Sequence, residues 1–351
     1  MKNQLQNTLL SIIIICVFGG VCFADEPAKS NSSKSTLTPE EQRAINKGLE
    51  WLVSQQTRSG RWNGPNGRYP AAMTGMAGIA LSCEGSTATQ GKYSSNIRRA
   101  IDYLTAQSQP NGLIGSQLDD RYIYGHGFAM LFLSQALGEE EDADRRATLI
   151  DVLTRAVVFS GQAQTSNGGW GYVSAKEGSD FDEGSTTITQ VQGLRGCRNA
   201  GIPVPKEIID KAVTYIHRCT NEDGGVIYSL KSGGGGRPAI TAAAVSCLLN
   251  AGEYDDSCVP RQLEYCKKNL DNLSSSGMGY WHYAHYYYAQ VKYRTGGDEW
   301  ETYRSQISKR IISEMQPNGC WNQGYNGAVM TSAINLTILQ LEKGLLPIYQ
   351  R

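Results

Sequence analysis

Residues 164–170 read QTSNGGW, and a matching stretch at 56–62 reads QTRSGRW. In both stretches a glutamine, a glycine and a tryptophan stand at the same spacing. Four of the six tryptophans of the chain lie two residues after such a glycine. The turn glycines recur every 40 to 56 residues, and they are Gly60, Gly112, Gly168, Gly224, Gly279 and Gly319. A period of this length indicates one packing unit repeated six times.

Each repeat is expected to hold two helices of different character. Residues 97–107, 208–218 and 303–315 are amphipathic, whereas 71–78 and 239–245, which follow a turn, are rich in small residues. Small residues allow close packing on all sides, so these helices suit an inner ring, and the amphipathic helices suit an outer ring facing water.

The ends of the repeat array indicate a closed ring. An open stack of repeats needs polar caps, but the last pair of segments, 303–315 and 328–341, is as apolar as the middle ones. The sequence therefore predicts an all-α fold, an (α/α)6 toroid of six helical hairpins over residues 39–345, followed by a tail at 346–351.

The N-terminus predicts export. Residues 1–24 have a lysine near the start, an apolar stretch at 9–21 and small residues before Asp25, as in a signal peptide. The apolar stretch is too short for a comfortable membrane span. We expect an exported protein of the periplasm or cell surface, or a secreted one, with a flexible tether at 25–38 and order from Pro39, where Thr38 can cap the first helix.

Charge and cysteine content exclude some classes of function. Lys and Arg number 33, as do Asp and Glu, so a nucleic-acid partner is not expected. Seven of the nine cysteines follow the signal segment, and we expect most to be small buried residues. No Cys-x-x-Cys spacing is present. We expect neither a metal nor another cofactor, and the sequence does not determine the oligomeric state.

The repeat resembles that of squalene cyclases and protein prenyltransferase β subunits, over nearly the whole chain after the signal segment. In that family the glutamine and tryptophan tie neighbouring helices together. The resemblance thus implies a structural role for Gln56, Trp62, Gln164 and Trp170. It also implies a terpenoid or another lipid as ligand.

The resemblance extends to an acidic stretch after the third turn. Class II terpene cyclases of this family carry an Asp-x-Asp-Asp motif whose middle aspartate protonates the substrate, and residues 180–183 here read DFDE. The match implies that Asp182 is the acid and that Asp180 and Glu183 flank it. Glu183 and Gly184 depart from the family pattern. Two other interpretations stay open: the acids cap a helix start, or they bind calcium.

Aromatic residues form a second cluster at 280–288, which reads YWHYAHYYY. On a helix these side chains would either line a cavity in the ring or pack between helices. We expect substrate-binding residues here and at the start of the second inner helix. They are His126, Tyr124, His282, Tyr283, Tyr286 and Tyr287. His217 is expected at the surface.

Three functions remain open from the sequence. The first is a cyclase-like or prenyltransferase-like enzyme acting on a terpenoid or lipid, although prenyltransferases hold zinc at the inner-helix starts and Asp256-Ser257-Cys258 lies elsewhere. The second is a non-catalytic binding or scaffold toroid of the cell envelope. The third is a carbohydrate-active toroid, because 19 tyrosines against 6 phenylalanines also fit a polar, aromatic cleft that binds a glycan.

Overall fold

A computed structural model describes residues 37–350 except 117, 179 and 275–279. The predicted signal segment and nearly all of the predicted tether lie outside the described residues. The described residues belong to one unit that begins at Leu37, and they contain twelve α-helices, three short 3-10 helices and only isolated β-bridges. The first described helix begins at Pro39, and Thr38 caps it by exchanging hydrogen bonds with Glu41.

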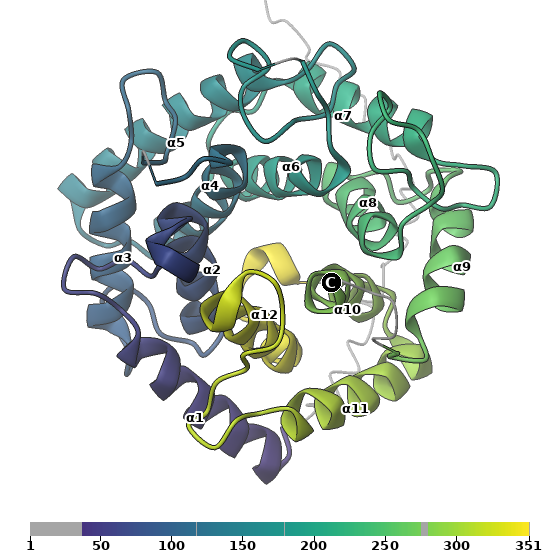
Figure 1. Ribbon diagram of the computed structural model, residues 1–351. Coiled ribbons are helices and arrows are strands. Elements are labelled where there is room, and N and C mark those ends of the chain that lie inside the picture. Colours follow the sequence, from purple (N-terminus) through teal and green to yellow (C-terminus); the bar gives the residue numbers. More distant parts are fainter. Residues whose placement is uncertain (1–36, 117, 179, 275–279, 351) are drawn as a thin grey trace, which may run out of the picture. The chain divides into compact units, whose positions relative to one another are not determined.

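The helices alternate between an outer and an inner ring (Figure 1). The outer helices are α1 (Pro39–Ser54), α3 (Ser94–Ala106), α5 (Ala143–Ala163), α7 (Lys206–Cys219), α9 (Val259–Leu270) and α11 (Gly297–Ser313). The inner helices are α2 (Pro70–Ser82), α4 (Tyr122–Gly138), α6 (Gly184–Asn199), α8 (Pro238–Ala251), α10 (Trp281–Thr295) and α12 (Gly327–Gln340). Each inner helix contacts the next, and α12 contacts α2. The predicted all-α toroid is therefore confirmed.

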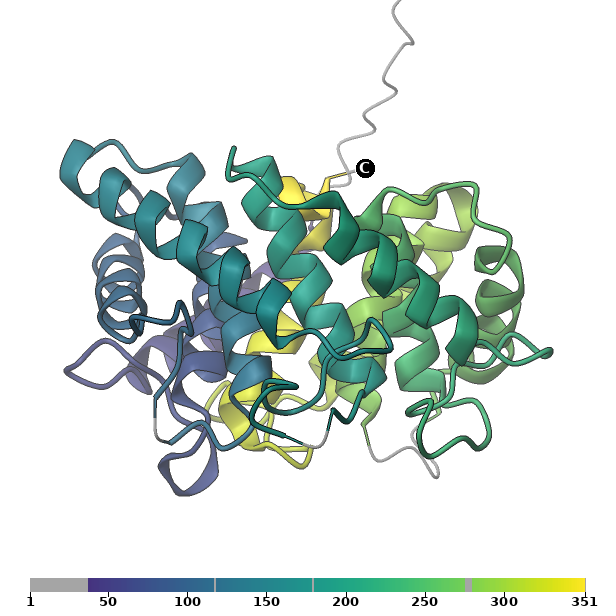
Figure 2. The ribbon, with the colours of Figure 1, turned by 90° about the horizontal axis from the view of Figure 1, so that it is seen from above.

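Inner and outer helices differ as their sequences require. In α2 every residue except the last is buried, whereas in α3 the buried residues form one face. A helix that is apolar all round needs neighbours on every side. Only the inner ring supplies them, because the outer helices face water on one side. The turns that lead into the inner helices gather along one edge of the ring, the lower edge in Figure 2. We call that end of the ring the mouth.

The turn glycines hold each repeat against the next one. Gly168 has a φ of +95°, and a Cβ atom there would lie 2.3 Å from the carbonyl oxygen of Lys211 in the following outer helix. At Gly60, Gly112 and Gly224 a Cβ atom would lie 2.2 Å from the corresponding carbonyl oxygen of the next outer helix. The last turn closes the ring, because Gly319 packs in this way against the carbonyl of Lys47 in α1. Gly279 lies outside the described residues.

The tryptophans join the two helices of a repeat. The indole N–H of Trp170 donates to the carbonyl of Ser160 in the outer helix at 2.8 Å, and its backbone N–H donates to Thr187 Oγ1 in the inner helix at 3.1 Å. The corresponding residues Trp62 and Trp321 repeat both bonds. All three side chains are fully buried.

The glutamines of the motif reach across to the next repeat. Gln164 Nε2 donates to the carbonyls of Gly168 and Ile208, the latter in the next outer helix, and Gln56 makes the equivalent pair of bonds. Glutamine, glycine and tryptophan therefore act together as one structural unit.

The end of the chain lies inside the ring, at the end opposite the mouth. After the 3-10 helix η2 (Leu341–Lys343), the segment η3 (Pro347–Tyr349) packs against α6. Tyr349 and Ile348 are buried, and the Tyr349 hydroxyl is 2.7 Å from that of Tyr286. The part of the predicted tail that is described is thus a packed element.

Two further features concern the chain as described. None of the described helices is both long and apolar enough to cross a bilayer. The seven cysteines of the described part are all buried and unpaired, and burial raises the pKa of the thiols of Cys83, Cys197 and Cys219 to about 12.

We predict that Gly168→Ala lowers the free energy of unfolding by at least about 3 kcal/mol, because the new methyl group meets a carbonyl and the backbone is left-handed. Gly67 is the matched control. Its φ is +78°, but a Cβ there meets nothing within 4 Å, so Gly67→Ala costs only about 1 kcal/mol. Urea unfolding measures both. Equal losses would contradict the contact with the next outer helix.

Candidate functional site

The three acids of the 180–183 stretch point to different places. Asp182 is fully buried and faces the loops at the outer side of α6. Its carboxylate accepts hydrogen bonds of 2.8–3.1 Å from Asn167 Nδ2, the hydroxyls of Tyr215 and Ser229, and the backbone N–H of Leu230. The carboxylate joins three segments of the chain.

Asp180 and Glu183 have surroundings that differ from each other and from those of Asp182. Asp180 is partly exposed, and bonds from the backbone and hydroxyl of Ser166 lower the pKa of its carboxyl group. Glu183 is buried and is the N-cap of α6, where it accepts a 2.9 Å bond from the backbone N–H of Thr186. The helix-start interpretation therefore holds for Glu183. The three carboxylates do not surround one point.

Glu183 is the acid that reaches towards the interior of the ring. Ser185 Oγ donates to its carboxylate at 2.6 Å, and the hydroxyl of Tyr124 donates at 3.1 Å. Tyr283 adds to the group from α10, because its hydroxyl donates to the carbonyl of Ser185 at 2.7 Å. Burial raises the pKa of Glu183, and the hydrogen bonds oppose this shift. The structure thus brings together Glu183, predicted as an acid flanking Asp182, and two of the predicted substrate-binding residues, Tyr124 and Tyr283.

The remaining residues of the α10 cluster fill the space between helices. Tyr286 meets Tyr349, and the rings of Tyr286 and Tyr287 pack edge to face at 4.9 Å. His282 bonds to Asn335 Oδ1 in α12 at 3.1 Å. All three side chains of α10 are buried. They form helix interfaces inside the ring, which is the second interpretation that the sequence left open.

His126 is fully buried between the turn before α4 and the outer helix α5. Its Nδ1 accepts from the backbone N–H of Ile114 at 3.1 Å, and its Nε2 lies 3.1 Å from the carbonyl of Ala156. Thr187 holds the same place in the third repeat, where its hydroxyl accepts a hydrogen bond from the backbone N–H of Trp170 in the turn. Burial lowers the pKa of His126 to about 4, so the ring is neutral at pH 7. The expectation that it faces the mouth or cavity is not met.

A set of tyrosines at the mouth is the feature that the sequence reasoning missed. One or more tyrosines stand in the turn before each inner helix or in its first residues. We call the following residues the tyrosine rim: Tyr69, Tyr124, Tyr172, Tyr228, Tyr280 and Tyr325. The signal was a tyrosine between each turn glycine and the first residues of the inner helix that follows, at a spacing that varies from repeat to repeat.

Contacts link the rim across several repeats. The rings of Tyr124 and Tyr172 stack at 6.0 Å, and the hydroxyls of Tyr172 and Tyr228 bond to each other. Tyr280, with 58% of its surface exposed, is close enough to Tyr172 to help raise the pKa of that phenol. Tyr325 is 81% exposed. Tyr280 and Tyr325 therefore offer ring faces and hydroxyls to solvent, whereas the other four tyrosines of the rim are half-buried.

Arginines lie over the rim. The guanidinium of Arg121 is 4.3 Å from the ring centre of Tyr172, and that of Arg237 is 4.4 Å from the ring centre of Tyr228. Both arginines are exposed. Stacking on an aromatic ring holds a guanidinium in place while its N–H donors stay free to bind a ligand.

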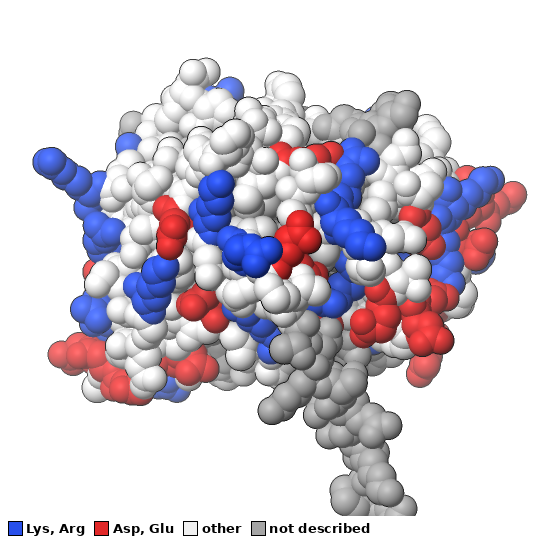
Figure 3. Space-filling view, turned by 90° about the horizontal axis from the view of Figure 1, so that it is seen from below, with Lys and Arg blue, Asp and Glu red and all other residues white. Residues whose placement is uncertain are grey.

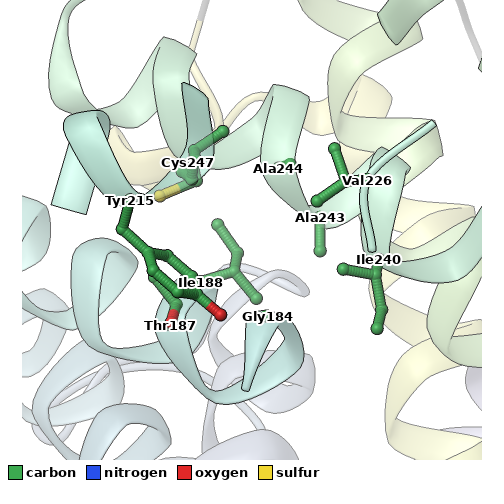
Figure 4. Close-up of a pocket in the computed structure, with 10 residues that line it drawn as sticks. Gly184, Thr187, Ile188, Tyr215, Val226, Ile240, Ala243, Ala244 and Cys247 are labelled. Atoms are coloured by element: carbon green, nitrogen blue, oxygen red, sulfur yellow. The ribbon is translucent and has the colours of Figure 1, made fainter. Parts of the chain in front are cut away.

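A small void lies behind α6. The cavity between α6, α7 and α8 measures about 10 Å³, and Ile188, Ile240 and Cys247 are among the apolar side chains around it (Figure 4). This is the space of about one water molecule. It is a packing defect and does not hold a ligand.

One group of side chains could hold a metal. His217, Asp256 and Cys258 place their ligand atoms within 4.8 Å of one another, which no other set of His, Cys and acidic residues in the described part does. His217 Nε2 is 2.5 Å from Asp256 Oδ2, so a hydrogen bond already accounts for this part of the grouping. The group lies between the outer helix α7 and the connection that precedes α9.

Charge is mixed on the side of the ring shown in Figure 3, where basic and acidic side chains alternate over α1 and α11. A single-sign patch, which a nucleic acid would need, is not present on this side.

Comparisons with known proteins concern the fold. No family model matches the chain, and no significant match is found among curated proteins. Solved structures do match. The type II terpene cyclase MstE from Scytonema has a TM-score of 0.60 at 14% identity, covering 88% of this chain and 100% of the cyclase. The GH76A α-1,6-mannanase from Salegentibacter has a TM-score of 0.63 at 8% identity, covering 87% and 99%.

The chain has the α/α toroid fold of these two enzymes. A protein from Actinoplanes matches as well, with a TM-score of 0.56 at 14% identity over 86% of this chain and 99% of that one. Similar toroids thus include a terpenoid-binding and a glycan-binding enzyme. At these identities the likeness extends to the fold alone.

The pKa of His126 makes stability depend on pH. The folded-state pKa of about 4 is below the ordinary 6.5, so the unfolded chain takes up a proton first as pH falls from 6.5 towards 4. Stability is lost over this range and is retained above it. We predict that His126→Thr, which copies the third repeat, removes about 3 kcal/mol of this pH-dependent loss.

Urea unfolding at pH 7 and pH 4.5 tests this. The variant should be less stable than the parent at pH 7 because it leaves a cavity, but it should change less between the two values. An unchanged slope with pH would show that His126 is not held neutral.

Proposed function

We propose that the toroid binds a glycan at its mouth, through the tyrosine rim and the arginines stacked on it. The supporting observation is the chain of contacts from Tyr124 through Tyr172 to Tyr228, with Arg121 and Arg237 over the rings. Sugars present both apolar ring faces and hydroxyl groups. Tyrosine offers an apolar face and a polar tip, and arginine adds donors in a fixed plane.

The interior of the ring favours a ligand at the mouth. Tyr283, Tyr286 and Tyr287 are buried against one another and against the chain end. A long hydrocarbon would need to displace these groups, whereas a glycan could rest on the exposed Tyr280 and Tyr325. Export, which the first 24 residues predict, would bring the mouth to glycans outside the cytoplasm.

The acids support binding more than hydrolysis. Glycoside hydrolysis in most families uses two carboxyl groups on opposite sides of the bond. In the DFDE stretch only Glu183 reaches the interior, and Asp182 is held by four donors on the other side of α6. One carboxyl group is too few for this reaction, but it is enough to accept a hydrogen bond from a bound sugar.

A second candidate is acid catalysis on a terpenoid, and one observation favours it. Burial raises the pKa of Glu183, which is the direction of shift that a carboxyl group acting as a general acid requires. In this version Glu183 takes the role that the resemblance assigns to Asp182, and the surrounding tyrosines would face the cation.

Tyr280→Ala should weaken glycan binding by roughly 3- to 10-fold, because one stacking face is lost. Tyr254→Ala is the matched control, since Tyr254 is 57% exposed at the opposite end of the ring. Titration calorimetry with α-1,6-mannotetraose and a panel of other oligosaccharides measures both variants. If no glycan binds, or if both variants lose affinity equally, the proposal fails.

Glu183→Gln separates the two candidates. If the protein only binds a glycan, we expect affinity to change by less than about tenfold, because one charged hydrogen-bond acceptor becomes neutral. For acid catalysis, conversion of a polyprenyl substrate such as geranylgeranyl dihydroxybenzoate should fall by at least about a hundredfold. Mass spectrometry of the products measures the conversion. If neither the parent protein nor the variant converts this substrate, the second candidate is excluded for it.

A further inference from the structure

A second cavity lies at the end of the ring opposite the mouth. Its volume is about 500 Å³, within the range of small-molecule sites. The C-terminal parts of α6, α8 and α10, the start of α9 and the chain end form its walls. The lining residues are Arg195, Asn199, Leu249, Tyr254, Val259, Leu263, Val291, Arg294, Thr295, Pro347 and Gln350.

Two arginines without an acidic partner meet in this cavity. Arg195 lies in the last turns of α6 and Arg294 in the last turn of α10. None of the ion pairs among the described residues includes either of them. Arg294 Nη2 donates to the backbone carbonyl of Ile348 at 2.9 Å. Two cations are therefore held together with only neutral groups around them.

The electrostatics of Arg294 show the cost of this arrangement. Burial lowers the pKa of its guanidinium, the charge of Arg195 lowers it further, and the neighbouring Tyr254 acts in the opposite direction. Like charges in a partly desolvated place repel each other more strongly than they do in water. The carbonyls at the helix ends carry only partial negative charge. An anion bound between the arginines would relieve the repulsion.

Two half-buried arginines elsewhere in the ring do have an acid. Arg304 pairs with Glu41 at 3.1 Å and Arg310 pairs with Glu314 at 2.5 Å. Arg61 is half-buried and belongs to none of the ion pairs of the described residues, so what distinguishes Arg195 and Arg294 is that two such arginines line the same cavity.

The rest of the lining is apolar. Leu249, Leu263, Val291 and Pro347 come from four different segments and surround the space beside the arginines. A small inorganic anion would leave this part of the cavity filled with water only. The lining matches a molecule that has one charged end and an apolar body.

We propose that this cavity binds an amphipathic carboxylate, with the carboxylate between Arg195 and Arg294 and the apolar body along α8 and α9. Guanidinium groups suit a carboxylate because their planar donors match its two oxygens. Tyr254 supplies a hydroxyl at the edge of the cavity. The site is separate from the mouth and does not depend on what the mouth binds.

Dodecanoate below its micelle concentration is a suitable probe, and dodecan-1-ol has the same tail without the charge. We expect dodecanoate to bind with 1:1 stoichiometry in titration calorimetry, to raise the Tm, and to bind at least tenfold more tightly than dodecan-1-ol. Arg195→Gln should weaken dodecanoate binding at least tenfold. Arg198 is exposed and lies about one turn further along α6, so Arg198→Gln should change the affinity for dodecanoate less than twofold.

Further variants keep the test decisive. Arg195→Lys retains the charge and should keep affinity within about fivefold, which separates loss of charge from loss of folding. Tyr254→Ala should weaken dodecanoate binding while Tyr280→Ala leaves it unchanged, the reverse of their effects at the mouth. Three results would overturn the proposal: dodecan-1-ol binding as tightly as dodecanoate, equal effects of Arg195→Gln and Arg198→Gln, or displacement of dodecanoate by phosphate at equal concentration.

Discussion

The contact between each turn glycine and the backbone of the next outer helix sets the geometry of this ring. A carbonyl oxygen lies where a side chain would begin, so only glycine fits, and its left-handed conformation turns the chain back towards the centre. Because Gly319 makes the same contact with the first outer helix, the sixth turn joins the end of the array to its start. Glutamine and tryptophan then secure the turn from both sides.

This constraint also determines where ligands can bind. The turns bring the first residues of all inner helices to the mouth, so the tyrosines that stand in these turns or at these helix starts gather there as the tyrosine rim. At the opposite end the inner helices stop without such turns, and the chain end packs between them. The two ends therefore differ in chemistry: hydroxyls, aromatic faces and stacked arginines at one, and paired arginines above an apolar cavity at the other.

Much of the fold could be predicted from the sequence because the period of glycine and tryptophan, the alternation of helix types and the helix start at Thr38 are local patterns. The site could not be predicted to the same extent. Asp182 and Glu183 are neighbours in the chain, but the backbone at Glu183 is extended, so their side chains point to opposite sides of α6. His126 replaces a hydroxyl of other repeats, and such an exchange is visible only when the partners are known. Arg195 and Arg294 are far apart in sequence and line the same cavity only because α6 and α10 both pack against α8.

Closure of the ring is the central claim, and the pair of Glu41 in α1 and Arg304 in α11 tests it most directly. These residues are 263 positions apart, largely buried and joined by a bond of 3.1 Å. A double-mutant cycle with Glu41→Gln and Arg304→Met, measured by urea unfolding, isolates their interaction. A closed ring predicts a coupling free energy of about 1 to 3 kcal/mol. Additive single effects, with no coupling, would contradict closure.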